Sequence, residues 1–207
     1  MLRKALLLLT MTIGLALVVI AGVLNHRDRT RAAQRAREAR VDLVKDDAPV
    51  VSSDVDESLR GKPAPNFSLI DLAGNKVSLA DFRGHPLVLN FWGTYCDPCK
   101  IEMPWLEEFS KKYASEGFDV IGVTYDSEVG KVKIASDTKK LGVTYPILLS
   151  DPKIEDAYLA NTEVLPVSFW VDKNGKVVNV TAGLSGKTFG DAKQALESQV
   201  QQTIAAN

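Results

Sequence analysis

Cysteine and histidine are both scarce in this chain, which has two of each among its 207 residues. Small secreted scaffolds depend on several spaced disulfides, so a single close pair of cysteines excludes that class. A structural zinc site takes four cysteine or histidine ligands. His26 belongs to the N-terminal region and only His85 lies near the cysteines in the sequence, so we expect no metal site.

A dominant charge is also missing, since 25 basic residues face 26 acidic ones and the net charge is −1. Domains that bind nucleic acid usually carry a strong basic excess. The composition therefore gives no support for a nucleic-acid partner. At this length, and with 45% hydrophobic residues, the chain can bury one substantial core.

The two cysteines that are present, Cys96 and Cys99, form a Cys-x-x-Cys motif. An apolar, β-prone segment at 86–92 precedes them, and residues 100–114 after them have the apolar spacing of a helix. The start of a helix has unpaired N–H groups and a partial positive charge, which stabilise a thiolate. The motif at this strand-to-helix junction therefore predicts thiol–disulfide exchange.

A long uncharged run occupies residues 5–24. About 20 apolar residues are enough for a helix to cross the hydrocarbon core of a membrane. We expect an uncleaved transmembrane anchor here, with residues 1–4 on the cytoplasmic side. A cleaved signal peptide is the alternative, although its apolar region is usually shorter.

Residues 25–60 are expected to form a tether between this anchor and a soluble domain at 61–207. Their first part is rich in arginine, and their second part is acidic and poor in hydrophobic residues, as flexible segments are. Counted locally, the arginines would keep the bulk of the chain in the cytoplasm.

The soluble domain alternates between strand and helix patterns. The expected order is a hairpin at 67–79, a strand at 87–92, a helix at 100–114, a strand at 118–124, a helix at 127–141, a strand at 145–149, a short helix at 151–159, a hairpin at 167–180 and a helix at 190–204. This order predicts an α/β domain whose mixed central sheet has helices on both faces.

Four stretches of this domain resemble the membrane-tethered thioredoxin-like proteins of the TlpA/ResA group, which includes CcmG-type proteins. They are the active-site pattern at 89–99 (with Tyr95 where tryptophan is usual), Glu-Met-Pro at 102–104, Leu-Pro and its strand at 165–172, and the closing hairpin at 174–178. The resemblance covers the whole soluble domain. It implies a thioredoxin-like fold with an added N-terminal hairpin, and an extracytoplasmic, periplasmic location at the inner membrane, against the local charge count.

The two cysteines have different expected roles. Cys96, at the helix start, should be the exposed nucleophile, with a pKa below the roughly 8.5 of a free thiol. Cys99 should be the buried thiol that resolves the mixed disulfide; an inert buried pair is the alternative. Asp97 adds a negative charge beside the thiolate and Pro98 stiffens the turn, so we expect a reductant rather than a strong oxidant.

Three further positions complete the candidate site. Glu102 shares a helix face with the second cysteine, and the resemblance implies that it carries protons; a surface carboxylate is the alternative. Pro166 resembles the cis-proline beside the disulfide in thioredoxin folds, where neighbouring backbone binds an extended peptide; an edge-strand proline is the alternative. Leu165 and Tyr95 complete the expected substrate-binding set.

These residues predict a membrane-tethered thiol–disulfide oxidoreductase that reduces protein disulfides, and the resemblance implies that its soluble domain is extracytoplasmic. It should need no cofactor beyond its own Cys96–Cys99 disulfide. The resemblance implies apocytochrome c as a substrate, in cytochrome c maturation, and a membrane thiol carrier as the electron donor.

Two other functions match parts of the pattern. The stretches at 64–69 and 81–84 also occur in peroxiredoxins, but those enzymes need Pro-x-x-x-Thr-x-x-Cys, and Thr94 lies two residues before Cys96 instead of three. A Cu(I)-binding or oxidase-assembly module is the second alternative, because two thiolates suit Cu(I). Related copper chaperones, however, space their cysteines one residue wider and add a downstream histidine.

Overall fold

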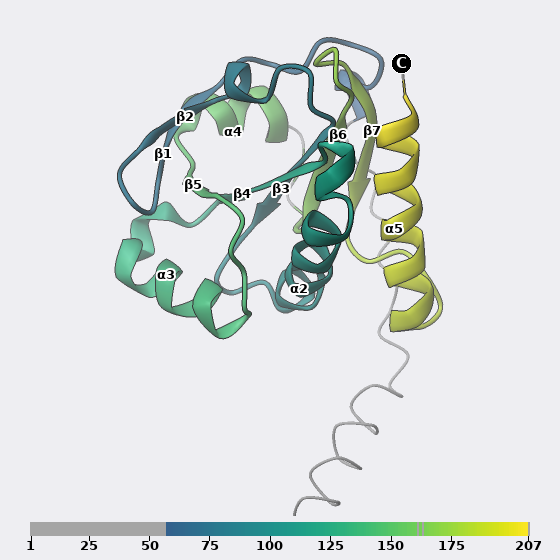
Figure 1. Ribbon diagram of the computed structural model, residues 1–207. Helices are drawn as coiled ribbons and strands as arrows, with labels where there is room; N and C mark the ends of the chain where they lie inside the picture. The colour runs from purple at the N-terminus through teal and green to yellow at the C-terminus, as the bar shows by residue number, and fades with distance from the viewer. Residues whose placement is uncertain (1–56, 161, 163, 207) are drawn as a thin grey trace, which may run out of the picture. The chain divides into compact units, whose positions relative to one another are not determined.

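The computed structural model describes residues 57–160, 162 and 164–206 (Figure 1). The expected N-terminus at 1–4, the anchor at 5–24 and all but the last four residues of the tether at 25–60 lie outside the described residues. Within the described part of the chain, no helix is both long enough and apolar enough to span a bilayer.

Seven strands form one mixed sheet in the order β2-β1-β5-β4-β3-β6-β7. They are β1 (Ser68–Asp71), β2 (Lys76–Ser78), β3 (Leu87–Trp92), β4 (Asp119–Thr124), β5 (Ile147–Leu149), β6 (Val167–Val171) and β7 (Val177–Ala182). Strands β3, β4 and β5 are parallel, while β1 joins β5 and β6 joins β3 in antiparallel pairs. The pairs β1–β2 and β6–β7 are antiparallel hairpins at the two edges.

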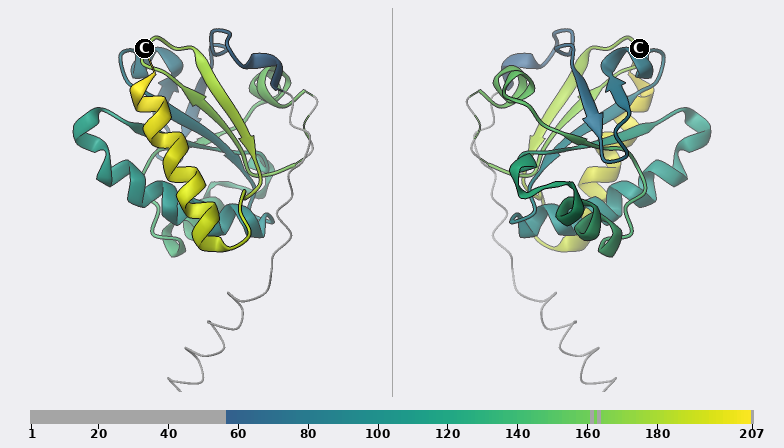
Figure 2. Two further views of the ribbon diagram at one scale, coloured as in Figure 1. Left: turned by 90° about the vertical axis from the view of Figure 1, so that its right-hand side faces the viewer. Right: turned by 90° about the vertical axis from the view of Figure 1, so that its left-hand side faces the viewer.

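Helices cover both faces of this sheet, so the α/β architecture and the order of elements predicted from the sequence are confirmed. The α-helices are α2 (Asp97–Lys112), α3 (Lys131–Lys140), α4 (Pro152–Leu159) and α5 (Phe189–Ala205). Figure 2 shows α2 and α5 packed on the same face. Buried residues of α3 belong to the same apolar cluster as those of α2 and α5, whereas α4 packs in the cluster on the opposite face.

One predicted helix is wrong at its start. The pattern at 127–141 is a short 3-10 turn, η4 (Ser127–Val129), followed by α3. Gly130 separates the two with a φ of 89°, which lies outside the helical region and is readily adopted only by glycine.

Strand β3 is central to the sheet and every one of its residues is buried. Its side chains alternate between the two faces. Leu89 and Phe91 pack on the α4 side, and Val88 and Trp92 pack on the α2 side. Asn90 lies on the same face of the sheet as Val88 and Trp92 and is completely buried. A buried amide is costly unless it forms hydrogen bonds, so Asn90 requires polar partners beneath α2.

Candidate active site

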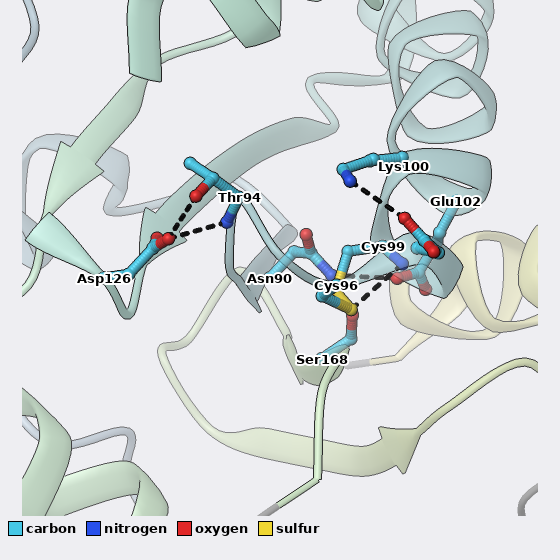
Figure 3. The surroundings of a disulfide bond; sticks show 9 residues. Asn90, Thr94, Cys96, Cys99, Lys100, Glu102, Asp126 and Ser168 are labelled. Atoms are coloured by element: carbon cyan, nitrogen blue, oxygen red, sulfur yellow. Dashed lines mark hydrogen bonds and ion pairs between the residues drawn. A yellow bond between two sulfur atoms is a disulfide. The ribbon is translucent and has the colours of Figure 1, made fainter. Parts of the chain in front are cut away.

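A disulfide joins Cys96 and Cys99 at the start of α2 (Figure 3). The helix begins at Asp97, three residues earlier than its apolar spacing indicates, because Cys96 caps it: the Cys96 sulfur accepts a hydrogen bond of 3.2 Å from the backbone N–H of Cys99. Pro98 fits the first turn, where an N–H has no partner within the helix. The disulfide therefore lies at the positive end of the helix dipole.

The two cysteines differ in accessibility, but less than the sequence suggested. Cys99 is completely buried, as expected, whereas Cys96 is only 6% exposed in this disulfide form and is not the exposed residue that we predicted. The reason is that Cys96 packs in the same apolar cluster as Trp92 and Met103. Cys96 is still the more accessible of the two sulfur-bearing residues.

Glu102 lies on the inner face of α2 and is 2% exposed, which excludes the alternative of a surface carboxylate. The Nδ2 group of Asn90 donates hydrogen bonds to Oε2 of Glu102 (3.1 Å) and to Oγ of Ser168 in β6 (2.9 Å) (Figure 3). Burial raises the pKa of Glu102 to about 8, although the hydrogen bond from Asn90 lowers it in part. The helix of the disulfide therefore carries a buried carboxyl group that keeps its proton to a higher pH than an exposed glutamate does.

Asn90 and Ser168 had no assigned role in the sequence interpretation of the site. Asn90 lies on β3 and Ser168 lies 78 residues further along the chain, opposite it in the register of β3 and β6. The available signal was a polar residue inside each of two otherwise apolar strands, since such residues are buried only with partners.

The loop between β3 and α2 is held by Asp126, another residue that the sequence interpretation missed. Asp126 is buried, and its carboxylate accepts hydrogen bonds from the N–H of Thr94 (2.9 Å), the hydroxyl of Thr94 (2.5 Å) and the hydroxyl of Thr124 (2.8 Å). It follows β4 at the edge where the parallel strands β3 and β4 end. The hydroxyl of Thr94 is thus bonded to Asp126 and is not left free for the role that a peroxidase threonine has.

Pro166 lies at the same end of the sheet, because it directly precedes β6 and Val167 pairs with Phe91. The Leu165–Pro166 peptide bond is cis. Since β6 lies between β3 and β7, the alternative of an edge-strand proline is wrong. Leu165 is half-buried and packs against the apolar clusters on both faces.

The remaining predicted residues, Tyr95 and Asp97, flank Cys96 in the sequence and have exposed side chains. Tyr95 is 64% exposed, an unusual state for a large aromatic side chain. The carboxylate of Asp97 forms an ion pair of 2.9 Å with Lys100. This pair is exposed, so it contributes little to stability, but Lys100 offsets part of the charge that Asp97 places near Cys96.

Over the described residues, no group of three or more His, Cys, Asp or Glu side chains is arranged to hold a metal ion. The cysteines Cys96 and Cys99, whose thiolates would suit a soft metal ion such as Cu(I), here form a disulfide.

This chain is similar to several known proteins. Residues 60–180 match the AhpC/TSA family. The thiol-disulfide oxidoreductase ResA of Geobacillus thermodenitrificans is 37% identical over 139 residues, which cover 67% of this chain and 76% of that protein. The ResA protein of Bacillus subtilis is 40% identical over 126 residues, covering 59% and 67%.

Solved structures show the same fold. A thiol:disulfide interchange protein DsbE of Chlorobium tepidum superposes with a TM-score of 0.60 at 30% identity, covering 70% of this chain and 97% of that one. A thioredoxin-family thiol:disulfide interchange protein of the same organism gives 0.59 at 26% identity, with 70% and 97% covered. The fold is therefore thioredoxin-like, with a cysteine pair at the start of α2. The chain belongs to the AhpC/TSA family and, within it, to the thioredoxin-like thiol–disulfide oxidoreductases.

Proposed function

We propose that this enzyme reduces disulfide bonds of other proteins at the extracytoplasmic side of a membrane, with Cys96 as the attacking thiol and Cys99 as the resolving thiol. The observation that carries the proposal is the combination of a disulfide at a helix N-terminus with a buried carboxyl group, Glu102, on the same helix. The helix end stabilises the thiolate that attacks. The carboxyl group can take the proton of the thiol that resolves.

The reaction begins with the reduced enzyme. The Cys96 thiolate attacks one sulfur of the substrate disulfide, the other substrate sulfur leaves as a thiolate, and a mixed disulfide forms. Cys99 then gives its proton to the Glu102 carboxylate and attacks the Cys96 sulfur. The second substrate sulfur leaves, two electrons have passed to the substrate, and the enzyme is left with the Cys96–Cys99 disulfide.

The pKa of about 8 suits Glu102 to this step. A general base works best when its pKa lies near the operating pH, because it must both accept and release the proton. An ordinary surface glutamate, with a pKa near 4.5, would be a weak acceptor for a thiol proton. The hydrogen bond from Asn90 holds the carboxyl group in one position beneath the helix.

Substrate binding is assigned to the surface around the cysteines. The exposed ring of Tyr95 provides an apolar contact beside Cys96. The backbone at Leu165 and Pro166, at the same end of the sheet, is suited to an extended peptide in the manner of strand addition. The proposed reaction uses no bound cofactor.

The proposal also covers the location of the enzyme, its substrate and its electron donor. The uncharged run at 5–24 supports a membrane anchor, and the resemblance to the TlpA/ResA group supports an extracytoplasmic domain. Apocytochrome c, whose haem-binding cysteines must stay reduced, is the proposed substrate, and a membrane thiol carrier is the proposed electron donor.

A trapping experiment tests this function. In a Cys99→Ala variant the mixed disulfide through Cys96 cannot be resolved, so it should accumulate on the substrate. We expect exported proteins to be recovered with Cys99→Ala and none with the matched Cys96→Ala control. Covalent capture by Cys96→Ala alone would reverse the two roles, and capture of cytoplasmic proteins alone would contradict the proposed location.

A further inference from the structure

The side-chain amide of Asn90 connects two strands and a helix inside the domain. Its Nδ2 group donates hydrogen bonds to Oε2 of Glu102 on α2 (3.1 Å) and to Oγ of Ser168 on β6 (2.9 Å). All three side chains are buried. Because buried polar atoms have no access to bulk water, each of them needs a partner inside the protein.

The oxygen of this amide has no such partner. Within the described part of the chain, Oδ1 of Asn90 is buried and forms no hydrogen bond. Figure 3 shows this oxygen directed away from Ser168 and Glu102. Strand β3 lies between β6 and β4, so an amide whose nitrogen faces β6 has its oxygen toward β4, where Gly122 pairs with Asn90. The two hydrogen bonds with Glu102 and Ser168 thus both use the amide nitrogen.

This orientation of the amide suits only one protonation state of Glu102. An ionised carboxylate accepts hydrogen bonds, and Nδ2 of Asn90 supplies one. A protonated carboxyl group also carries an O–H, which must donate, and the N–H of an amide cannot accept from it. The Oδ1 atom of the same amide can accept this O–H after half a rotation about the Cβ–Cγ bond of Asn90. The rotation exchanges two atoms of similar size, so the surrounding packing need not change.

Ser168 lets the amide form its second hydrogen bond in either orientation. A serine hydroxyl can both accept and donate. Its Oγ accepts from Nδ2 of Asn90 in the present orientation, and in the reversed orientation its O–H would donate to Oδ1. The amide therefore makes one bond to Glu102 and one to Ser168 in both orientations, and in both it leaves one atom without a partner on the β4 side. The reversal thus costs no hydrogen bond.

We propose that the amide of Asn90 reverses whenever Glu102 gains or loses a proton. With Glu102 ionised, Nδ2 donates to Glu102 and Ser168; with Glu102 protonated, both of these residues donate to Oδ1. The use of this reversal rests on the proposed function: when Glu102 takes the proton of Cys99, the reversed amide accepts the new O–H and keeps the proton on Glu102. Ser168 is then a positioning residue, because it acts on Glu102 through Asn90. The change also reaches β6, the strand that Pro166 precedes.

The groups packed around the amide leave Glu102 as the one that controls it. Burial raises the pKa of Glu102 to about 8, although the hydrogen bond from Asn90 lowers it in part, so both forms occur near neutral pH. On the same helix, Cys99 is in the disulfide, and burial would raise the pKa of Glu107 but its hydrogen bonds lower it overall. Burial first, and then the charges of Glu102 and Glu107, raise the pKa of Tyr145 well above its ordinary value. The residues of β7, of the loop after it and of α5 that lie beside Glu102 are uncharged.

NMR of the oxidised, full-length protein labelled with nitrogen-15 tests the reversal directly. The side-chain amide signals of Asn90 are identified by their absence from Asn90→Leu. Above the pKa of Glu102, the Nδ2 protons should show nuclear Overhauser contacts with the β protons of Ser168. Below that pKa these contacts should be lost, and contacts with the α protons of Gly122 on β4 should replace them. The midpoint of the change should equal the pKa of Glu102 from an infrared titration of its carboxyl band.

Two controls accompany this measurement. The amide of Asn179 donates to Gln199, which does not titrate, so its contacts should be the same at every pH. In Glu102→Gln the contacts of Asn90 should also stop changing with pH.

The inference is overturned if the contacts with Ser168 persist in the wild-type protein on both sides of the infrared pKa, or if they change in the same way in Glu102→Gln. These readings use the oxidised protein and no substrate, so they are independent of turnover. A pH profile of substrate reduction that Glu102→Gln leaves unchanged would instead refute the proton role of Glu102, while the wild-type contacts would still decide whether the amide reverses.

Discussion

Replacing Glu102 by glutamine should remove a large pH dependence from the stability of the oxidised protein. Burial raises the pKa of this carboxyl group from 4.5 to about 8 in the folded state. Between these two values the folded chain keeps the proton and the unfolded chain releases it. Stability falls with rising pH wherever the folded state binds more protons than the unfolded state. The wild-type protein should therefore lose stability between pH 4.5 and about 8 on account of Glu102.

The size of this loss follows from the pKa difference. Each unit of difference corresponds to about 1.4 kcal/mol, so a rise from 4.5 to about 8 amounts to about 5 kcal/mol in total and to about 3 kcal/mol at pH 7. Glutamine keeps the shape of the side chain but carries no charge at any pH. The stability difference between Glu102→Gln and wild type should thus grow with a slope of about 1.4 kcal/mol per pH unit and level off above pH 8.

Denaturant unfolding at a series of pH values from 4 to 9, without reductant so that the disulfide stays closed, measures this difference. All other titrating groups are common to the two proteins and cancel in the subtraction. A stability difference that is the same at every pH would reflect the new amide group. The test is the slope of the stability difference against pH. A difference that does not change with pH would refute the claim that Glu102 is buried with a raised pKa.

Three further outcomes are expected. Asn90→Leu removes the hydrogen bond that lowers the pKa of Glu102, so that pKa should rise above about 8 in an infrared titration, and a fall would contradict the bond. Asp126→Ala leaves the N–H and hydroxyl of Thr94 without their acceptor, so it should lower the free energy of unfolding in denaturant by about 2–4 kcal/mol. The control Asp119→Ala, at an exposed ion pair, should lower it by less than about 1 kcal/mol. Equal losses in the two variants would contradict the role of Asp126 in holding the loop. Asp97→Asn takes a negative charge away from the Cys96 thiolate and should make the potential of the cysteine pair less negative, as redox-buffer titration would report; a shift to more negative values would contradict this.

Much of the fold was predictable because its signals are local. The buried run at 87–92, the helical spacing after it and the turn residues of the edge hairpins each depend on a few neighbouring residues. The start of α2 at Cys96 was predictable from the Cys-x-x-Cys motif but not from the apolar spacing, which begins three residues after Asp97, because Cys96 caps the helix in place of the usual serine, threonine or aspartate. The break at Gly130 was visible as a glycine, but a glycine inside a helical pattern does not by itself end the helix.

The candidate site was predictable only in its linear part. The cysteine pair and Glu102 share one helix, so their proximity follows from spacing. The partners of Glu102 come from strands β3 and β6, whose pairing joins Asn90 to a serine 78 residues away. Such contacts depend on how the sheet is assembled, and a single sequence contains no local pattern for them.

The reduction potential of the Cys96–Cys99 couple tests the central claim most directly. It can be measured by equilibrating the protein in redox buffers and counting alkylated cysteines by mass spectrometry. A reductase of protein disulfides should have a potential near that of thioredoxin, about −270 mV, or below it. A value near the roughly −120 mV of strong oxidants would show that the enzyme gives disulfides to its substrates instead of reducing them.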